Sequence, residues 1–227
     1  MSLLIRNGRV LDPSQGLDAT CDLWLHQGKV HRLEQSIEPP PQTRVIDARG
    51  LVVCPGFIDL HCHLREPGYE DKETIATGTA AAARGGFTTV CAMPNTEPAM
   101  DSAAVVDFVL RKAREEGVVK VLPIGCVTRG REGKALTDMA ELAQAGVIGF
   151  SDDGSPVADE GLMRQALAQT TSLNLPIIDH CEEPALSRGG VMNDGSVARR
   201  LGLRGVPASA EEAMVARDIS LAEQTGG

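Results

Sequence analysis

The sequence has 227 residues, 42% hydrophobic and 23% charged, which is the composition of an ordinary globular protein and excludes disordered, collagen-like and coiled-coil chains. The 22 basic and 31 acidic residues give a net charge of -9, and only 3% of the residues are aromatic. A nucleic-acid partner is therefore not expected, because the net field repels polyanions and few rings are available to stack on bases.

Six cysteines are scattered along the chain without a Cys-x-x-Cys pair, in a sequence too long to need disulfide bonds for its stability. The N-terminus lacks the pattern of a signal peptide, and no uncharged run is apolar enough to span a bilayer. We therefore expect a cytoplasmic protein with no membrane partner.

Residues 1–50 predict a small all-β unit. β-forming runs at residues 3–5, 9–11, 21–25, 29–33 and 44–47 are separated by turn signals, among them Asn7-Gly8 and Gln27-Gly28. Asn-Gly between β-formers is a strong hairpin signal. Such a unit alone has little core to bury.

From residue 51 onward, apolar runs alternate with helical patterns, which is typical of parallel βα units. Five strands are predicted, at residues 52–60, 87–92, 118–124, 147–150 and 175–179. Helices are predicted at residues 72–84, 102–116, 135–145, 160–172 and 209–224.

The first βα turn distinguishes the two folds that use such units. An open dinucleotide-binding sheet has Gly-x-Gly-x-x-Gly after its first strand, whereas this sequence has Asp59-Leu60-His61-Cys62-His63. The turn therefore favours a closed barrel with metal chemistry at its strand ends over the open doubly wound sheet.

His61 and His63 lie two residues apart at the end of the first barrel strand. Because strand side chains alternate with a period of two, both imidazoles share a face and can bind one ion at about 2.0 Å. Cys62 faces the other way and is not expected to be a ligand. A pair of polar turn residues is the alternative, but the position beside Asp59 at the catalytic end of the strand favours a metal.

Two other strand ends carry residue types that bind metals. His180 follows the fifth strand, and in a barrel all strand C-termini open on one rim. Asp152 and Asp153 follow the fourth strand, where adjacent carboxylates repel each other unless a cation lies near. Periodicity does not choose between these two aspartates, and a solvated Asp-Asp-Gly turn is the alternative.

Arg65 and Asn95 follow the first and second strands on the same predicted rim. An arginine fork and an amide suit a substrate carboxylate, although both residue types also serve to fix loops.

With these motifs in order along the chain, the sequence resembles the dihydroorotases of the amidohydrolase superfamily. The resemblance rests on five segments. They are Pro-Gly-Phe-Ile-Asp-Leu-His-Cys-His-Leu-Arg-Glu-Pro-Gly (55–68), Gly-Gly-Phe-Thr-Thr-Val (85–90), Met-Pro-Asn-Thr (93–96), Phe-Ser-Asp-Asp-Gly (150–154) and His-Cys-Glu (180–182). Hydantoinases, dihydropyrimidinases and allantoinases share the His-x-His motif but bridge their metals with a carboxylated lysine, where this sequence has Asp-Asp.

The resemblance implies reversible zinc-dependent hydrolysis of (S)-dihydroorotate to N-carbamoyl-L-aspartate in pyrimidine biosynthesis. It implies two zinc ions, with His61 and His63 on one, His180 on the other and Asp153 bridging. It also implies that Arg65 and Asn95 bind the substrate carboxylate. A homo-oligomer or a complex with aspartate transcarbamoylase is the implied assembly.

The implied fold is an amidohydrolase-type (β/α)8 TIM barrel with a small β-sandwich. Residues 1–50 would be the N-terminal part of the sandwich, and residues 51–227 the first five βα units of the barrel. The 177 residues from 51 to 227 hold five units at about 35 residues each, so eight units need about 280 residues, in line with typical barrels. We therefore expect an N-terminal portion of a longer enzyme, with no proton-shuttling residue in this chain and that aspartate beyond Gly227.

The 227 residues alone are expected to bind metal weakly and to lack measurable activity. Two alternatives stay open from the sequence. One is a non-catalytic dihydroorotase-like partner of aspartate transcarbamoylase, and the other is a cyclic amidase of the hydantoinase or dihydropyrimidinase type.

Overall fold

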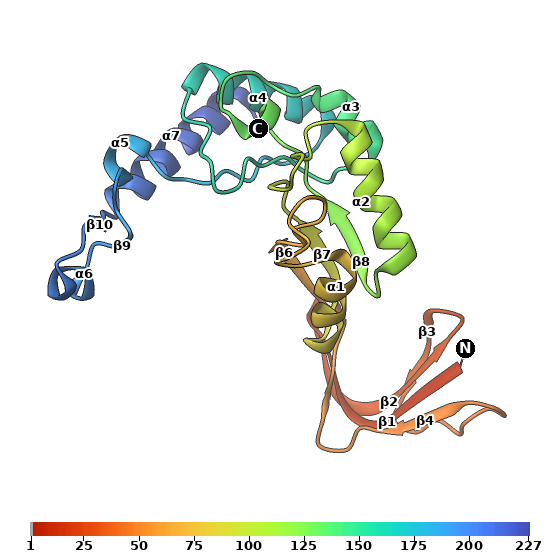
Figure 1. The fold of residues 1–227 in the computed structure, drawn as a ribbon. Coiled ribbons are helices and arrows are strands. Elements are labelled where there is room, and N and C mark those ends of the chain that lie inside the picture. Colours follow the sequence, from red (N-terminus) through yellow and green to blue (C-terminus); the bar gives the residue numbers. More distant parts are fainter. Residues whose placement is uncertain (1) are drawn as a thin grey trace. The chain divides into compact units, whose positions relative to one another are not determined.

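The computed structural model describes residues 2–227. The chain divides into a first compact unit that ends at Gly56 and a second unit, Phe57–Gly227. The first unit is a β-sheet in the order β3-β2-β1-β4, with β5 also paired to β1 (Figure 1). Its elements are β1 (Ser2–Asp12), the single-turn 3-10 helix η1 (Pro13–Gln15), β2 (Leu17–His26), β3 (Lys29–Glu34), β4 (Arg44–Asp47) and β5 (Val52–Val53).

The hairpin expected at Asn7-Gly8 is wrong, because β1 continues through these residues with a bulge. Asn7 has a φ of 61°, and its N–H donates to the Asp22 carboxylate at 2.9 Å. The same buried carboxylate accepts the N–H of Ile37 at 3.0 Å. Two residues of β1 thus oppose one of β2, which is the pattern of a β-bulge. The turn expected at Gln27-Gly28 is confirmed, with positive φ at both residues between β2 and β3.

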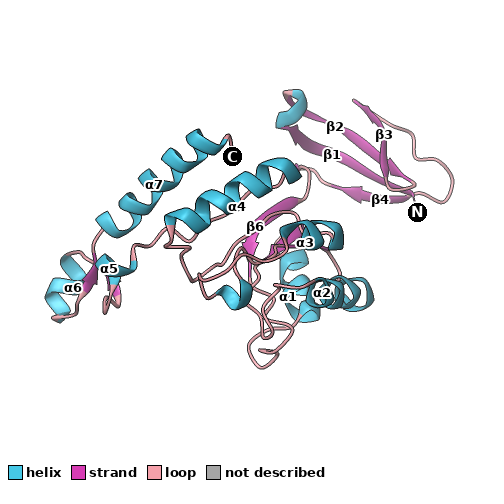
Figure 2. Ribbon diagram, turned by 90° about the horizontal axis from the view of Figure 1, so that it is seen from above, coloured by secondary structure: helices cyan, strands magenta, loops and turns pink. Residues whose placement is uncertain are grey.

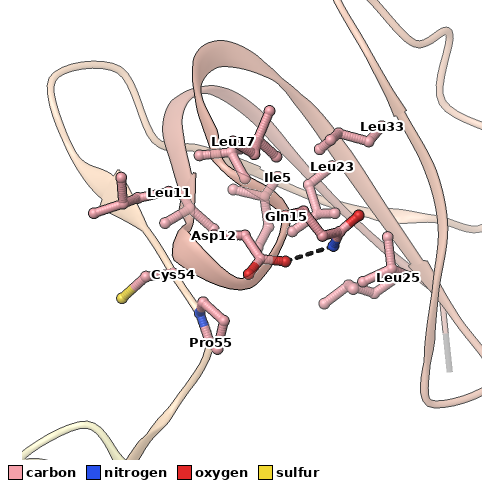
Figure 3. Close-up of a pocket in the computed structure, with 13 residues that line it drawn as sticks. Ile5, Leu11, Asp12, Gln15, Leu17, Leu23, Leu25, Leu33, Cys54 and Pro55 are labelled. Carbon is pink, nitrogen blue, oxygen red and sulfur yellow. Dashed lines mark hydrogen bonds between the residues drawn. The ribbon is translucent and has the colours of Figure 1, made fainter.

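An open apolar pocket lies on the first unit (Figure 3). Leucines of β1, β2 and β3 line it, and Gln15 donates to Asp12 beside them at 2.5 Å. These leucines are Leu11, Leu17, Leu23, Leu25 and Leu33. Val30 and Leu33, which also line it, are exposed. The first unit therefore buries little core.

The second unit begins with a parallel three-stranded sheet in the order β6-β7-β8. The strand expected over residues 52–60 is wrong as a single element, because Val52–Val53 pair with β1 whereas β6 starts at Phe57. Cys54, Pro55 and Gly56 separate the two strands, and proline cannot donate to a strand ladder. The strands of the sheet are β6 (Phe57–Cys62), β7 (Phe87–Ala92) and β8 (Lys120–Pro123).

The connections are helical, as expected. Helix α1 packs on β7 and α2 on β8, and the two helices lie side by side (Figure 2). Two helices start later than expected, because Thr74 and Asp138 cap their N-termini with side-chain hydrogen bonds. The five main helices are α1 (Ile75–Arg84), α2 (Ala103–Glu116), α3 (Met139–Ala145), α4 (Glu160–Leu173) and α7 (Ser209–Thr225).

The fourth and fifth expected strands are wrong as regular strands. Phe150 forms isolated parallel bridges to Gly125 and to Ile177, so both segments continue the parallel order by single bridges. Pro123 and Pro176 remove ladder donors at these positions. Several short elements between residue 180 and α7 were not expected: α5 (Pro184–Ser187), β9 (Met192–Asn193), α6 (Ser196–Leu201) and β10 (Gly205–Val206), in addition to the 3-10 turn η2 (Arg129–Arg131) after β8.

Phe150 belongs to the largest core cluster and is 0% exposed. This cluster joins the segment around Phe150 to α2, α3, α4 and α7, and it includes Val106, Leu142, Leu167 and Leu221. The core therefore supports the chain directly before Asp152 and Asp153. Within residues 2–227, none of the helices combines the length and apolarity that a membrane crossing requires.

Candidate metal centre

Three of the four predicted metal ligands lie together at the C-terminal end of the sheet. His61 Nε2 is 3.2 Å from Asp153 Oδ1, and His63 Nε2 is 3.6 Å from Asp153 Oδ2. The two imidazole rings are 5.1 Å apart and nearly perpendicular. One ligand atom from each of the three residues lies within 4.8 Å of the others. The Asp153 side chain is 12% exposed and that of His61 49%, so the cluster is open on one side.

Asn95 links two members of this cluster. Its Oδ1 lies 2.9 Å from His63 Nδ1, and its Nδ2 donates to Asp153 Oδ2 at 2.9 Å. An amide oxygen only accepts, so His63 Nδ1 donates in this pair, and in the neutral imidazole Nε2 is the lone-pair nitrogen on the side of Asp153. A partner on the second ring nitrogen is the usual way in which a protein orients a ligating histidine.

The two adjacent aspartates have different environments. The Asp152 carboxylate is buried and accepts the N–H groups of Val127 at 2.8 Å and Thr128 at 3.1 Å, and the Thr128 hydroxyl. Burial raises the pKa of the Asp152 carboxyl, and the hydrogen bonds from Thr128 and Val127 oppose that rise. Asp152 therefore holds a loop, and Asp153 is the carboxylate that faces the histidines.

Cys62 points away from the histidine face, as expected from strand periodicity. It packs against an apolar cluster that includes Leu64 and Val90, and burial raises the pKa of its thiol to about 12. A thiol in this environment stays protonated, whereas a metal ligand must be a thiolate.

His180 lies outside the three-residue cluster. Its Nε2 is 3.5 Å from Glu182 Oε2, and the chain has left the parallel order after Ile178. The structure thus does not bring the fourth predicted ligand to the other three, and its role stays a prediction.

Arg65 follows the histidine pair with a φ of 60°, and its carbonyl accepts the N–H of Tyr69 at 3.0 Å. Among the residues that the structure describes, the Arg65 guanidinium forms no ion pair. Its fork is therefore available to a ligand in this structure, as a carboxylate-binding role requires.

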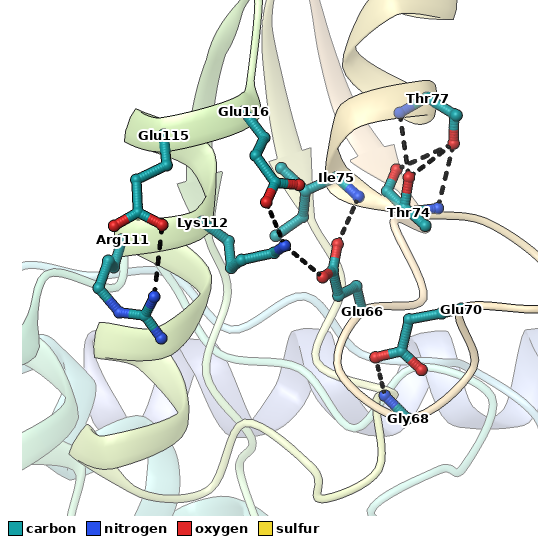
Figure 4. Close-up of polar contacts among 10 residues, drawn as sticks. All are labelled: Glu66, Gly68, Glu70, Thr74, Ile75, Thr77, Arg111, Lys112, Glu115 and Glu116. Carbon is teal, nitrogen blue, oxygen red and sulfur yellow. Dashed lines mark hydrogen bonds and ion pairs between the residues drawn. The ribbon is translucent and has the colours of Figure 1, made fainter.

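The residue after Arg65 anchors this loop and was not singled out in the sequence. Glu66, with its side chain 7% exposed, accepts the N–H of Ile75 at the start of α1 at 2.9 Å and pairs with Lys112 of α2 at 3.1 Å (Figure 4). Lys112 also pairs with Glu116 at 2.5 Å. A charged residue between Arg65 and Pro67 gives no signal of burial, so sequence reasoning had no means to find this anchor.

A second group of metal-ligand residue types contains Asp179, Cys181 and Asp218. Arg217 donates to Asp218 at 2.6 Å and lies 3.6 Å from Asp179, so a cation already occupies this group. Burial and the neighbouring Asp218 raise the pKa of Asp179 to about 6, and burial raises that of Cys181 to about 12. We interpret this group as an ion-pair network between residue 179 and α7.

Comparisons with known proteins identify the family of this chain. The family model described as dihydro-orotase-like matches residues 50–227. A dihydroorotase of Geobacter sp. (strain M21) is 50% identical over 226 residues, which cover 100% of this chain and 53% of that protein. The dihydroorotases of Pelotomaculum thermopropionicum and Aquifex aeolicus are 51% and 46% identical, with 100% of this chain and 52% and 53% of those proteins covered. The chain thus spans about half the length of the curated relatives it matches.

Solved structures with a similar fold include a hydantoinase and a dihydropyrimidinase. The L-hydantoinase (dihydropyrimidinase) from Arthrobacter aurescens has a TM-score of 0.79 at 20% identity, over 99% of this chain and 51% of that one. The dihydropyrimidinase from Brevibacillus agri NCHU1002 has a TM-score of 0.74 at 23% identity, over 99% and 50%. At these identities the likeness is one of fold, and it supports an α/β fold of the amidohydrolase type.

Proposed function

Since this chain belongs to the dihydro-orotase-like family, we propose that the protein in which it occurs is a zinc-dependent dihydroorotase. The reaction is the reversible hydrolysis of the cyclic amide of (S)-dihydroorotate to N-carbamoyl-L-aspartate, a step of pyrimidine biosynthesis. The relatives named dihydroorotase, at 46% to 51% identity over the whole chain, support this activity. The wider class, hydrolysis of cyclic amides, also fits the hydantoinase-type fold.

The observation that carries the proposal is the placement of one carboxylate against two imidazoles. Nitrogen and oxygen ligands about 2.0 and 2.1 Å from a tetrahedral zinc lie about 3.3 Å apart. The two Nε2–carboxylate distances are 3.2 and 3.6 Å. With Nδ1 donating to Asn95, the Nε2 lone pair of the neutral His63 ring faces the carboxylate, and a cation between the two atoms removes their repulsion. The donor set of His61, His63 and Asp153 fits a divalent cation, and its nitrogen and oxygen atoms suit zinc.

We propose two zinc ions, with Asp153 shared between them and His180 on the second. A divalent cation in such a site lowers the pKa of water and polarises an amide carbonyl as a Lewis acid. The segment 147–154 contains two aspartates and no lysine, which favours the aspartate-bridged class over the carboxylated-lysine class.

The residues around the cluster orient it and bind the substrate. Asn95 accepts from His63 and donates to Asp153, which holds both ligands in place. An amide nitrogen has two hydrogens, so the second one remains for the substrate carboxylate. Arg65 supplies the charged fork for the same carboxylate. No residue of this chain is proposed to transfer the proton to the leaving nitrogen.

We further propose the closed eight-stranded barrel as the complete fold, with residues 57–227 supplying five βα units. This part begins six residues later than the predicted residue 51, because β5 pairs with β1 of the first unit. Consecutive parallel pairing from β6 to Ile177 supports this arrangement. A cytoplasmic location is supported by the six cysteines, all of which are unpaired. A homo-oligomer or a complex with aspartate transcarbamoylase remains the proposed assembly.

The test uses the natural polypeptide, purified with zinc and offered dihydroorotate or dihydrouracil. We expect turnover of dihydroorotate, which His61→Ala abolishes and His31→Ala preserves. His31 is a matched control because it is an exposed histidine of β3 that packs on Trp24. Turnover of dihydrouracil alone would instead support a hydantoinase-type amidase. A protein without zinc and without turnover would support the non-catalytic partner.

A further inference from the structure

The turn that carries Asp153 is not part of a regular strand. Residues 147–150 belong to the parallel order only through single bridges at Phe150. Metal ligands must nevertheless hold their distances to within about 0.2 Å. Contacts outside the sheet therefore have to fix this turn, which we define as residues 151–155.

One set of contacts runs from this turn to the loop after β8, residues 127–133. The Asp152 carboxylate, on a residue that is 1% exposed, accepts both N–H groups at residues 127 and 128 and the Thr128 hydroxyl. The same hydroxyl accepts the N–H of Gly133 at 3.0 Å. A buried carboxylate with this many donors closes the loop around itself.

A second set of hydrogen bonds has its donors in the 127–133 loop side chains and its acceptors in the 151–155 turn. Arg131, in the 127–133 loop, donates to the carbonyl oxygens of Asp152 at 3.4 Å and of Asp153, and to Ser155 Oγ at 3.4 Å. Within the turn, the Asp153 N–H donates to Ser151 Oγ at 3.1 Å. The guanidinium is planar and rigid, so one side chain fixes two successive peptide groups.

From these reciprocal contacts we infer that Arg131 is a positioning residue, which orients Asp153 toward His61 and His63 and so sets the metal affinity of the site. The inference rests on the metal site of the proposed function. Arg131 reaches only the backbone of the turn and Ser155, so it acts on the metal through Asp153.

The sign of the effect separates positioning from simple charge. Removing a positive charge near a cation site strengthens cation binding by Coulomb attraction alone. Loss of positioning weakens it, by roughly 10- to 100-fold for partners that orient a ligand. Arg129 is a matched control, because it lies two residues away in the same 127–133 loop and its Nε donates instead to Leu136 O at 3.3 Å.

The experiment measures zinc affinity of the natural polypeptide by competition with a chromophoric chelator, and records the visible spectrum of its Co²⁺ form. We expect Arg131→Met to weaken zinc binding at least tenfold and to alter the Co²⁺ bands. Arg131→Lys restores part of the affinity because one ammonium can donate to one carbonyl. Arg129→Met binds zinc within twofold of the parent and keeps its Co²⁺ spectrum.

Two results would overturn the inference: zinc binding by Arg131→Met as tight as or tighter than the parent, or an equal loss in Arg129→Met. If Arg131→Met does not fold, as judged by its melting transition, the zinc affinities of Arg131→Lys and Arg129→Lys are compared instead. A loss confined to Arg131→Lys supports the inference, and parental affinity or an equal loss in both variants overturns it. Failure to hydrolyse dihydroorotate, together with the expected order of affinities, would refute the proposed function and leave this inference standing.

Discussion

Replacing Asn95 with alanine removes two hydrogen bonds that connect members of the metal cluster. His63 Nδ1–H loses its acceptor at 2.9 Å, and Asp153 Oδ2 loses a donor at 2.9 Å. The His63 ring is then free to rotate or to carry its proton on Nε2, the atom that faces the carboxylate. Both changes lower the population of the binding arrangement.

Partners of this kind contribute roughly 10- to 100-fold to metal affinity, which corresponds to about 1.4 to 2.7 kcal/mol. Because Asn95 contacts two ligands, we expect Asn95→Ala to fall in this range and to lower the zinc affinity by at least tenfold. The assay is chelator competition on the natural polypeptide, with KM for dihydroorotate measured at saturating zinc.

Glu97→Gln is the control, since Glu97 is an exposed side chain in the same loop. It is expected to leave the zinc affinity within twofold of the parent. An Asn95→Ala protein with parental zinc affinity and a raised KM would refute the reasoning, because Asn95 would then act on the substrate alone.

Three further predictions concern the anchors of the site and the metal. Glu66→Gln and Lys112→Met each lower the melting temperature, and the double variant lowers it by less than the sum of the two, since the side chains pair at 3.1 Å. Additive losses would show that the two side chains do not interact. Phe150→Ala lowers the free energy of unfolding by about 3 to 5 kcal/mol in denaturant unfolding, because the side chain is 0% exposed. A loss below about 1 kcal/mol would contradict the packing of Phe150 in the core cluster. Zinc at about 100 times its Kd stabilises the protein by about 2.7 kcal/mol, so chelation lowers the melting temperature of the parent and of His31→Ala but not of His61→Ala.

Much of the second unit was predictable because its signals are local. Strand periodicity placed His61 and His63 on one face, and alternating apolar and helical patterns predicted α1, α2, α3, α4 and α7. Helix starts moved by a few residues where Thr74 and Asp138 form caps.

Other features depend on distant contacts that no local pattern reports. Asn7-Gly8 looks like a hairpin, yet Asp22 on the neighbouring strand accepts the Asn7 N–H and makes a bulge. The break between β5 and β6 did carry a local signal, Pro55-Gly56, within a run that otherwise reads as one strand.

The distinction between Asp152 and Asp153 also lay beyond the sequence pattern. The preceding segment is apolar on both faces, so side-chain direction at its end has no period to follow. What separates the two aspartates is the 127–133 loop, whose N–H groups and hydroxyl satisfy Asp152 and leave Asp153 toward the histidines. Arg131 escaped notice for the same reason.

The central claim is that zinc binds between His61, His63 and Asp153. A crystal structure of the zinc-loaded natural polypeptide, with anomalous data collected at the zinc edge, tests it most directly. We predict an anomalous peak about 2.0 to 2.2 Å from His61 Nε2, His63 Nε2 and an Asp153 carboxylate oxygen. A peak at Asp179, Cys181 and Asp218 instead, with none beside His61 and His63, would contradict the claim.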